Sequence, residues 1–268
     1  MLLLLPPSET KRAGGAGSPL ALDTLSFPRL GEVRADLIEA TAALSEDRDA
    51  AIHALKLGPK QAAEIDRNRE LRTAPTMPVL LRYTGVLYDA LDAASFTEEQ
   101  WRFAASVVAV QSALFGLVGG ADGIPAYRLS FDSRLSPSLR KRWPEVSAAV
   151  LKERSDLILD LRSEGYAALG PLPQRDGVHY LRVLARDDAG NARALNHFNK
   201  QAKGLLTRAL IQAGIDFATT GDLLDWAAGE GYELSLGPER AGKRQLSLVV
   251  PAVTGQPGKL MAVLRAGV

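Results

Sequence analysis

The chain has 268 residues, of which 46% are hydrophobic and 24% are charged, and its formal net charge is +1. This is the composition of an ordinary globular protein, with length for one large domain or two small ones. It contains no cysteine, which excludes a disulfide framework, a thiol nucleophile and a Cys-ligated metal, and no apolar run is long enough to span a membrane.

The first predicted element is a buried strand over residues 2–5, four consecutive leucines closed by two prolines. Ser8, Glu9, Thr10 and Lys11 follow directly, and three glycines come after them. Open sheets bind ligands where buried strands end in polar groups, at the carboxyl edge. The alternative is a strand followed by a solvated surface loop.

Two helices are expected over residues 29–57, the second starting at Ser45 as N-cap. Gly58-Pro59 ends the second helix, and helix is expected to resume over 60–71. Further helices are expected over 79–91 and 97–103. The apolar run 107–110 predicts a buried strand that leads into Gln111 and Ser112.

In the second half, residues 127–131 are expected to be extended and 137–154 helical. Strands are predicted over 157–161 and 178–186, the first ending at Arg162, Ser163 and Glu164. Helices over 199–213 and 220–228 and strands over 232–236 and 245–250 complete the pattern. The mixed order of elements predicts an α+β fold: a single domain over 1–268 with a central sheet flanked by helices.

Residues 46–71 are similar to a helix-hairpin-helix element, in which hairpin amides and a helix N-terminus hold a DNA phosphate. Gly58 would form the hairpin, and Lys60 would add positive charge. The usual second hairpin glycine is absent, and Lys60 stands near its place. An ordinary corner between two helices is the alternative.

The helix expected over 199–213 places Lys200, Lys203 and Gly204 on one face, with Arg208 further along. A glycine inside a helix costs about 1 kcal/mol relative to alanine, so something is expected to approach that face closely. It is either another helix or a phosphate held by the lysines.

The strand tips carry groups suited to chemistry. A lysine beside a serine can form a nucleophile pair, and a glutamate can exchange protons with a lysine. The catalytic candidates are Lys11, Ser163, Glu164 and Lys203, and the expected cleft also includes Ser8, Gln111 and Ser112. The common enzyme motifs, such as the P-loop, GxSxG and HExxH, are absent.

Several segments together resemble the YaaA family, the peroxide-stress proteins of bacteria, over nearly the whole length. They are the opening PPSETK, YTGVLYDAL at 83–91, QSALFGLV at 111–118, PAYRL at 125–129, LDLRSEGY at 159–166, KQAKGL at 200–205 and EGY at 230–232. Tyr127 and Arg128 of the PAYRL segment join the expected cleft. Two departures are Glu9 in place of the family's lysine and Ala113 in place of a glycine.

The resemblance implies a cytoplasmic protein with a positively charged cleft. It also implies that the protein limits iron-driven DNA damage under peroxide. We therefore expect a DNA-binding stress-response protein that contacts backbone phosphates of double-stranded DNA with little sequence preference. The expected phosphate contacts are Gly58, Lys60, Lys200, Lys203 and Arg208. The alternative is an enzyme that acts on a nucleotide, a damaged base or another anionic ligand in a Lys/Ser/Glu-lined cleft.

Further expectations are a monomer, no cofactor, no membrane partner and no metal site. His53, His179 and His197 do not stand at metal-ligand spacing. Asp222 and Asp225 are three residues apart on a predicted helix, but the N-cap role expected for Asp222 (or Thr220) explains the pair without a metal. We expect no tight iron site and an indirect effect on iron.

Overall fold

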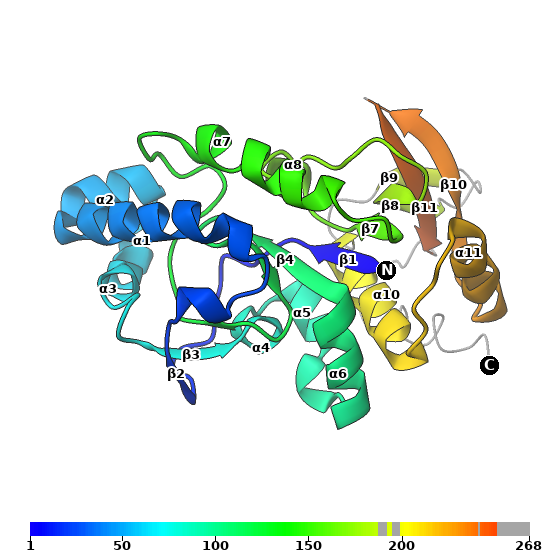
Figure 1. Ribbon diagram of the computed structural model, residues 1–268, viewed down its shortest axis with the longest axis horizontal. Helices are drawn as coiled ribbons and strands as arrows, with labels where there is room; N and C mark the ends of the chain where they lie inside the picture. The colour runs from blue at the N-terminus through cyan, green and yellow to red at the C-terminus, as the bar shows by residue number, and fades with distance from the viewer. Residues whose placement is uncertain (187–191, 195–198, 241, 251–268) are drawn as a thin grey trace.

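The computed structural model describes residues 1–186, 192–194, 199–240 and 242–250, and for Pro59, Lys60, Arg186 and residues 192–194 only the backbone. Within these residues, eight strands form the main sheet, in the order β10-β11-β8-β7-β1-β4-β5, with β9 added beside β8. The strands β4, β1, β7, β8 and β11 run parallel, whereas β5, β9 and β10 pair antiparallel to their neighbours. The expected mixed α/β domain with a central sheet is confirmed (Figure 1).

The strands of the main sheet are β1 (Leu2–Leu5), β4 (Val108–Ser112), β5 (Gly116–Gly119), β7 (Ile158–Asp160), β8 (Val178–Arg186), β9 (Ala192–Ala194), β10 (Glu233–Arg240) and β11 (Lys243–Val250). A small second sheet contains β2 (Gly17–Pro19), β3 (Pro75–Pro78) and β6 (Gly123–Ile124).

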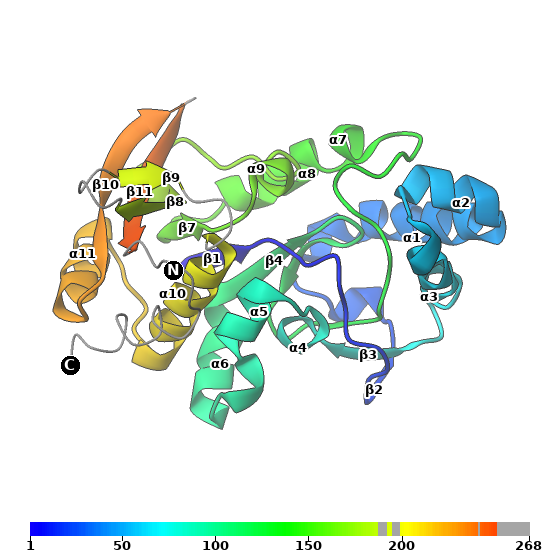
Figure 2. The same cartoon turned by 180° about the vertical axis from the view of Figure 1, so that it is seen from behind.

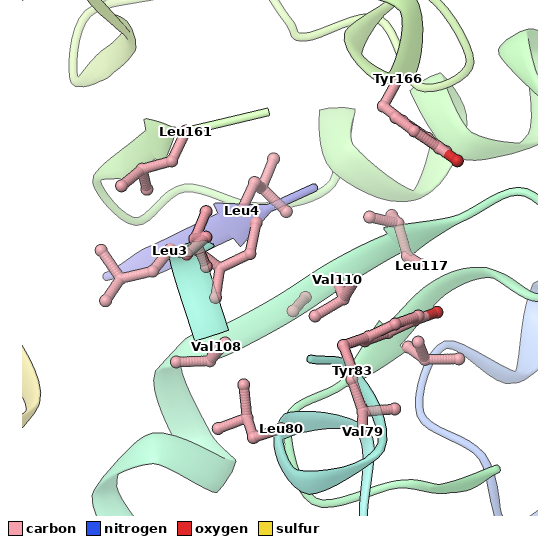
Figure 3. Packing of buried hydrophobic residues seen from close by; sticks show 14 of the residues in the cluster. Leu3, Leu4, Val79, Leu80, Tyr83, Val108, Val110, Leu117, Leu161 and Tyr166 are labelled. Carbon is pink, nitrogen blue, oxygen red and sulfur yellow. The ribbon is translucent and has the colours of Figure 1, made fainter. Parts of the chain in front are cut away.

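Strand β1 lies at the centre because every one of its side chains is apolar and buried, as a strand covered on both faces requires. Leu4 lies beside Ala109 of β4 and beside Asp160 of β7. Figure 3 shows the core packing around Leu3 and Leu4. The chain leaves β1 for β4 on one side and later returns to β7 on the other, so the strand order reverses at β1. Open parallel sheets bind ligands at such a reversal, outside the carboxyl ends of the strands.

Helices cover both faces of the sheet. In both views α8 lies on one side, and α5, α6 and α10 lie on the other (Figures 1 and 2). The α-helices are α1 (Gly31–Glu46), α2 (Arg48–Leu55), α3 (Ile65–Arg69), α4 (Val79–Arg82), α5 (Val86–Leu91), α6 (Glu98–Val107), α7 (Leu139–Arg142), α8 (Pro144–Lys152), α9 (Glu164–Ala167), α10 (Asn199–Ala213) and α11 (Thr220–Gly229). Short 3-10 helices are η1 (Leu22–Thr24), η2 (Pro28–Leu30), η3 (Pro59–Glu64) and η4 (Ala93–Ser95). No helix among the described residues is long and apolar enough to cross a membrane.

Several local expectations are wrong. Ser45 is buried inside α1 and donates to the Thr41 carbonyl, while Asp47 caps α2 through the amides of Asp49 and Ala50. The helix expected over 60–71 is instead the 3-10 turn η3 followed by the short α3.

Residues 127–131 form no strand, because the side-chain amide of Asn68 takes the place of a strand partner. Its Oδ1 accepts from the Arg128 amide at 2.7 Å, and its Nδ2 donates to the Arg128 carbonyl at 2.9 Å.

The N-cap of α11 is Thr219, which precedes both expected candidates, Thr220 and Asp222. Thr219 accepts from the Asp222 amide at 3.1 Å, and the Asp222 carboxylate accepts from the Thr219 amide at 3.1 Å. Asp222 therefore completes a capping box, which accounts for one member of the Asp222–Asp225 pair.

Candidate functional site

Lys11 is the centre of the site. After β1 the chain runs through Pro6 and Pro7 to Lys11, whose backbone bridges to Tyr83. The ammonium group turns back and donates to the carbonyls of Ser8 at 3.0 Å and Glu9 at 3.2 Å. It also lies 4.1 Å from the centre of the Tyr127 ring. The side chain is only 7% exposed, so the loop after β1 folds its lysine into the protein.

Burial lowers the pKa of Lys11 to about 7. Removal of the ammonium from water is the largest cause, and the nearby positive charge of Arg128 lowers the pKa further, while Glu9 opposes both. Backbone carbonyls and an aromatic face stabilise the cation less than a paired carboxylate would. A substantial part of the Lys11 population is therefore a neutral, nucleophilic amine at neutral pH.

A chain of hydroxyl groups runs beside Lys11. The Ser112 Oγ lies 2.8 Å from the Tyr127 hydroxyl, which lies 2.8 Å from the Tyr83 hydroxyl. Ser112 already accepts the amide hydrogens of Leu114 and Phe115, so its own proton goes to Tyr127. Tyr127 then donates to Tyr83, and the Tyr83 proton remains available to another acceptor.

Burial raises the pKa values of Tyr83 and Tyr127. Both phenols therefore stay protonated at neutral pH, and the chain acts as a set of donors. It connects the tip of β4 with the Lys11 loop.

Two carboxylates share Arg128. Its guanidinium lies 3.3 Å from Glu9 Oε2 and 3.6 Å from Glu64 Oε2. Both of these oxygens are buried without a hydrogen-bond partner, as is the Arg128 Nε. The hydroxyl of Tyr166, on α9, donates to Glu9 Oε1 at 3.4 Å. Buried polar atoms of Glu9, Glu64 and Arg128 that make no hydrogen bond therefore lie near Lys11, as in a binding site for a polar ligand.

A buried ion pair fixes the tip of β7. Arg162 donates to both oxygens of Asp160 at 2.8 Å and to Gln111 Oε1 at 3.2 Å, which ties β7 to β4. Lys203 of α10 lies over this tip and donates to the Arg162 carbonyl at 3.4 Å. Burial lowers the pKa of Lys203 to about 8.

The structure brings some of the expected residues together and separates others. Lys11 and Ser112 meet through Tyr127, and Gln111 reaches the same edge through Arg162. Ser163 and Glu164 are exposed at the start of α9 and, among the described contacts, neither bonds to Lys11. In their place, Tyr166 connects that segment to the centre.

In the helix-hairpin-helix-like element, the hairpin amide is bonded within the element itself. The Gly58 amide donates to Gln61 Oε1 at 3.1 Å, so this amide is not free for a phosphate. The side chain of Lys60 lies outside the described residues. The turn leads into a 3-10 helix rather than into the N-terminus of an α-helix.

The cations of α10 do not form one surface. Lys200 is exposed, whereas Lys203 is buried. Arg208 donates to the carbonyls of Leu91 at 2.9 Å and Asp92 at 3.0 Å, at the end of α5. A Cβ on Gly204 would lie 2.2 Å from the Leu87 carbonyl oxygen. Of the two expected neighbours of Gly204, the structure therefore has the helix, α5.

Sequence reasoning missed Tyr83, Glu64, Asp160 and Tyr166. Tyr83 and Tyr166 stand in segments that carry the family resemblance, which was the available signal. Glu64 had none, because its partner Arg128 is 64 residues away along the chain.

Comparison with known proteins places this chain in a family. The family model for peroxide stress protein YaaA matches residues 1–236. A UPF0246 protein of Corynebacterium efficiens is 42% identical over 256 residues, covering 93% of this chain and all of the relative. Another, from Streptomyces coelicolor, is 38% identical over 259 residues, covering 93% of this chain and 98% of the relative. A third, from Corynebacterium glutamicum, is 38% identical over 256 residues, covering 93% of this chain and all of the relative.

The fold is a mixed α/β fold in which the strand order reverses at β1, with a buried lysine, Lys11, in the loop that follows. Given the match over most of its length, the chain belongs to the YaaA family of peroxide stress proteins.

Proposed function

We propose that this peroxide stress protein acts on a nucleotide or a damaged base, with Lys11 as the nucleophile. The observation that carries the proposal is the Lys11 amine: buried at the reversal of the strand order, held by two backbone carbonyls, and with a pKa lowered to about 7. Structural lysines rarely need such an environment, and amine nucleophiles do.

The proposed step is an attack of the neutral Lys11 Nζ on C1′ of a damaged nucleotide. A bond forms between Nζ and C1′ as the bond from C1′ to the base breaks. The base leaves with the electron pair and takes up a proton, for which we propose the Tyr83 hydroxyl as the donor. Nζ then loses a proton, and the C1′–O4′ bond opens to an imine as O4′ takes up a proton.

The carboxylates of Glu9 and Glu64 support this proposal as proton acceptors, because each has a buried oxygen that is paired with the Arg128 guanidinium but accepts no hydrogen bond. Ser163 and Glu164, the acid/base candidates from the sequence, are exposed.

Borohydride trapping tests the proposal. The protein is mixed with a DNA duplex that contains one oxidised base, borohydride is added, and the covalent adduct is mapped by peptide mass spectrometry. We expect an adduct on Lys11 that disappears in Lys11→Gln and persists in the control Lys141→Gln, which removes an exposed lysine of α7. No adduct on oxidised, abasic or undamaged DNA, or an adduct confined to other lysines, would contradict the proposal.

A second proposal is that the protein holds double-stranded DNA by its phosphates. It is supported by Lys200, an exposed cation with no acid in the first turn of α10, on the helix that carries Lys203. Lys60 and Gly58 remain further proposed contacts. Arg208 is a weaker candidate, since it already binds the end of α5.

Salt-dependent titration tests DNA binding, because each phosphate contact releases counterions and steepens the fall of affinity with salt. Lys200→Glu is expected to weaken binding and to reduce the slope of log affinity against log salt by about one to two. Lys152→Glu, at the end of α8 on the opposite side of the sheet, is the control (Figure 2). Absence of binding at low salt, or the same loss in both variants, would refute this proposal.

A further inference from the structure

A cleft of about 530 Å³ lies at the tip of β7, next to Asp160 and Arg162. Its floor is the face of the sheet that carries Asp160 and Tyr180, which are partners in register on β7 and β8. The loop after α9 and the β10–β11 turn form its walls, through residues that include Arg175, Lys243 and Arg244. Lys11, Ser112 and Tyr127 are not among its lining residues, so it is a separate space.

Positive charge in this cleft exceeds the negative charge that could neutralise it. Asp160 is fully engaged by Arg162, and Arg244 is paired at 2.7 Å with Asp176 at the rim. That leaves Arg175 and Lys243 without a carboxylate partner among the described residues.

Arg175 donates only to the carbonyls of Asp156 and Asp176, and its Nε is buried with no hydrogen-bond partner. The remaining lining acid, Glu239, is exposed on β10. Arg175 therefore brings an uncompensated charge and an unused donor to the wall of the cleft.

Two ammonium groups also share one aromatic ring. The Nζ of Lys243 and the Nζ of Lys203 each lie 5.4 Å from the centre of the Tyr180 ring. The ring attracts both cations. Lys243 has no carboxylate partner among the described residues, so its charge on this side of the cleft favours a negatively charged occupant.

We propose that this cleft binds a phosphate monoester of a small organic molecule, with its phosphate between Lys243 and Arg175. Arginine and lysine are the usual phosphate ligands, and arginine donors match the phosphate oxygens in geometry. The volume is in the range of sites for small organic ligands and is larger than phosphate alone requires. The inference does not depend on Lys11 chemistry.

Isothermal titration calorimetry with four probes tests the proposal: inorganic phosphate, ribose 5-phosphate, adenosine 5′-monophosphate and adenosine. We expect at least one ester to bind ten times more tightly than inorganic phosphate or adenosine. Ribose 5-phosphate and adenosine 5′-monophosphate distinguish a sugar phosphate from a nucleotide.

Lys243→Gln and Arg175→Gln should each weaken ester binding at least tenfold, and Lys141→Gln should leave it unchanged. Lys243 is exposed, so its variant should fold, and a thermal melt checks Arg175→Gln. The proposal is overturned if no ester binds at millimolar concentration, if adenosine binds as tightly as the esters, or if Lys243→Gln has no effect. Loss of binding in Lys11→Gln would also overturn it, because the ligand would then occupy the other site.

Discussion

At the scale of single residues, the main feature is that this protein buries ionisable groups at the carboxyl edge of its sheet. Lys11 and Lys203 are 7% and 5% exposed, and neither has a carboxylate within salt-bridge distance among the described contacts. Burying such a cation is unfavourable. A fold selected only for stability would place a methionine or leucine there, so the cost itself supports a functional role for Lys11.

Because Lys11 is buried, the free energy of unfolding should depend on pH. Its pKa is about 7 in the folded state and 10.5 as an ordinary lysine, so the unfolded chain binds more protons between these values. The free energy of unfolding should therefore rise with pH in that window. Relative to Lys11→Met, the wild type should gain about 2–3 kcal/mol between pH 7 and pH 9.

Urea denaturation of both proteins at several pH values measures this gain. Other groups titrate in both proteins, and their contributions cancel in the difference. Parallel curves for the two proteins would mean that Lys11 has an ordinary pKa.

The Asp160–Arg162 pair gives a second prediction at this scale. Arg162→Met leaves Asp160, which is 1% exposed, without its cation, so we expect a loss of about 3–5 kcal/mol in the free energy of unfolding. Adding Asp160→Asn should recover part of that loss, because the buried side chain at position 160 is then uncharged. Chemical denaturation of the two single variants and the double variant measures the coupling. A double variant no more stable than Arg162→Met would show that the cost does not come from the isolated carboxylate.

The site residues that could be predicted from the sequence are those at the end of a predicted strand. Residues that reach the site from a distant segment of the chain were missed. Lys11, Gln111 and Ser112 were found because an apolar run ends beside them. Glu64 could not be found in this way, since it lies in a 3-10 turn and joins the site only through Arg128. Glu9, which replaces a lysine of the family, was not among the expected cleft residues, yet its buried oxygen is paired with Arg128.

At the scale of elements, long periodic patterns gave accurate boundaries. Strand β8 and helix α10 begin and end where residues 178–186 and 199–213 predicted them. The wrong predictions are at segments whose conformation depends on a side-chain contact or on a tight turn. Residues 127–131 pair with the Asn68 amide rather than with a strand, and a propensity argument cannot detect such a partner.

The packing of α10 on α5 gives a prediction at this scale. Gly204→Ala would place a Cβ 2.2 Å from the Leu87 carbonyl oxygen, so the helices must separate, and we expect a loss of about 1–3 kcal/mol or more in stability. Gly229→Ala in α11 is the matched control: a Cβ there meets nothing within 4 Å, so its effect should lie between neutral and about 1 kcal/mol stabilising. Thermal denaturation compares them, and equal effects would contradict the close packing.

At the scale of the whole molecule, the strand order creates the site. Because β1 lies between β4 and β7, the loops that follow these three strands are neighbours at one edge. The sequence predicted the strands and a shared edge, but not the order, since pairing between residues more than 100 positions apart leaves no local pattern. The antiparallel edge strands β5 and β10 complete the sheet around this parallel centre (Figure 1).

The pH dependence of trapping on Lys11 tests the central claim most directly. The initial rate of borohydride-trapped adduct on oxidised DNA is measured from pH 5.5 to pH 9.5, with Lys11 identified by peptide mapping. Because only the neutral amine attacks, the rate should rise with pH and level off with a midpoint near 7, the pKa that burial gives Lys11. A rate that continues to rise toward pH 10, as for an exposed lysine, or an unchanged rate in Lys11→Gln, would contradict the account.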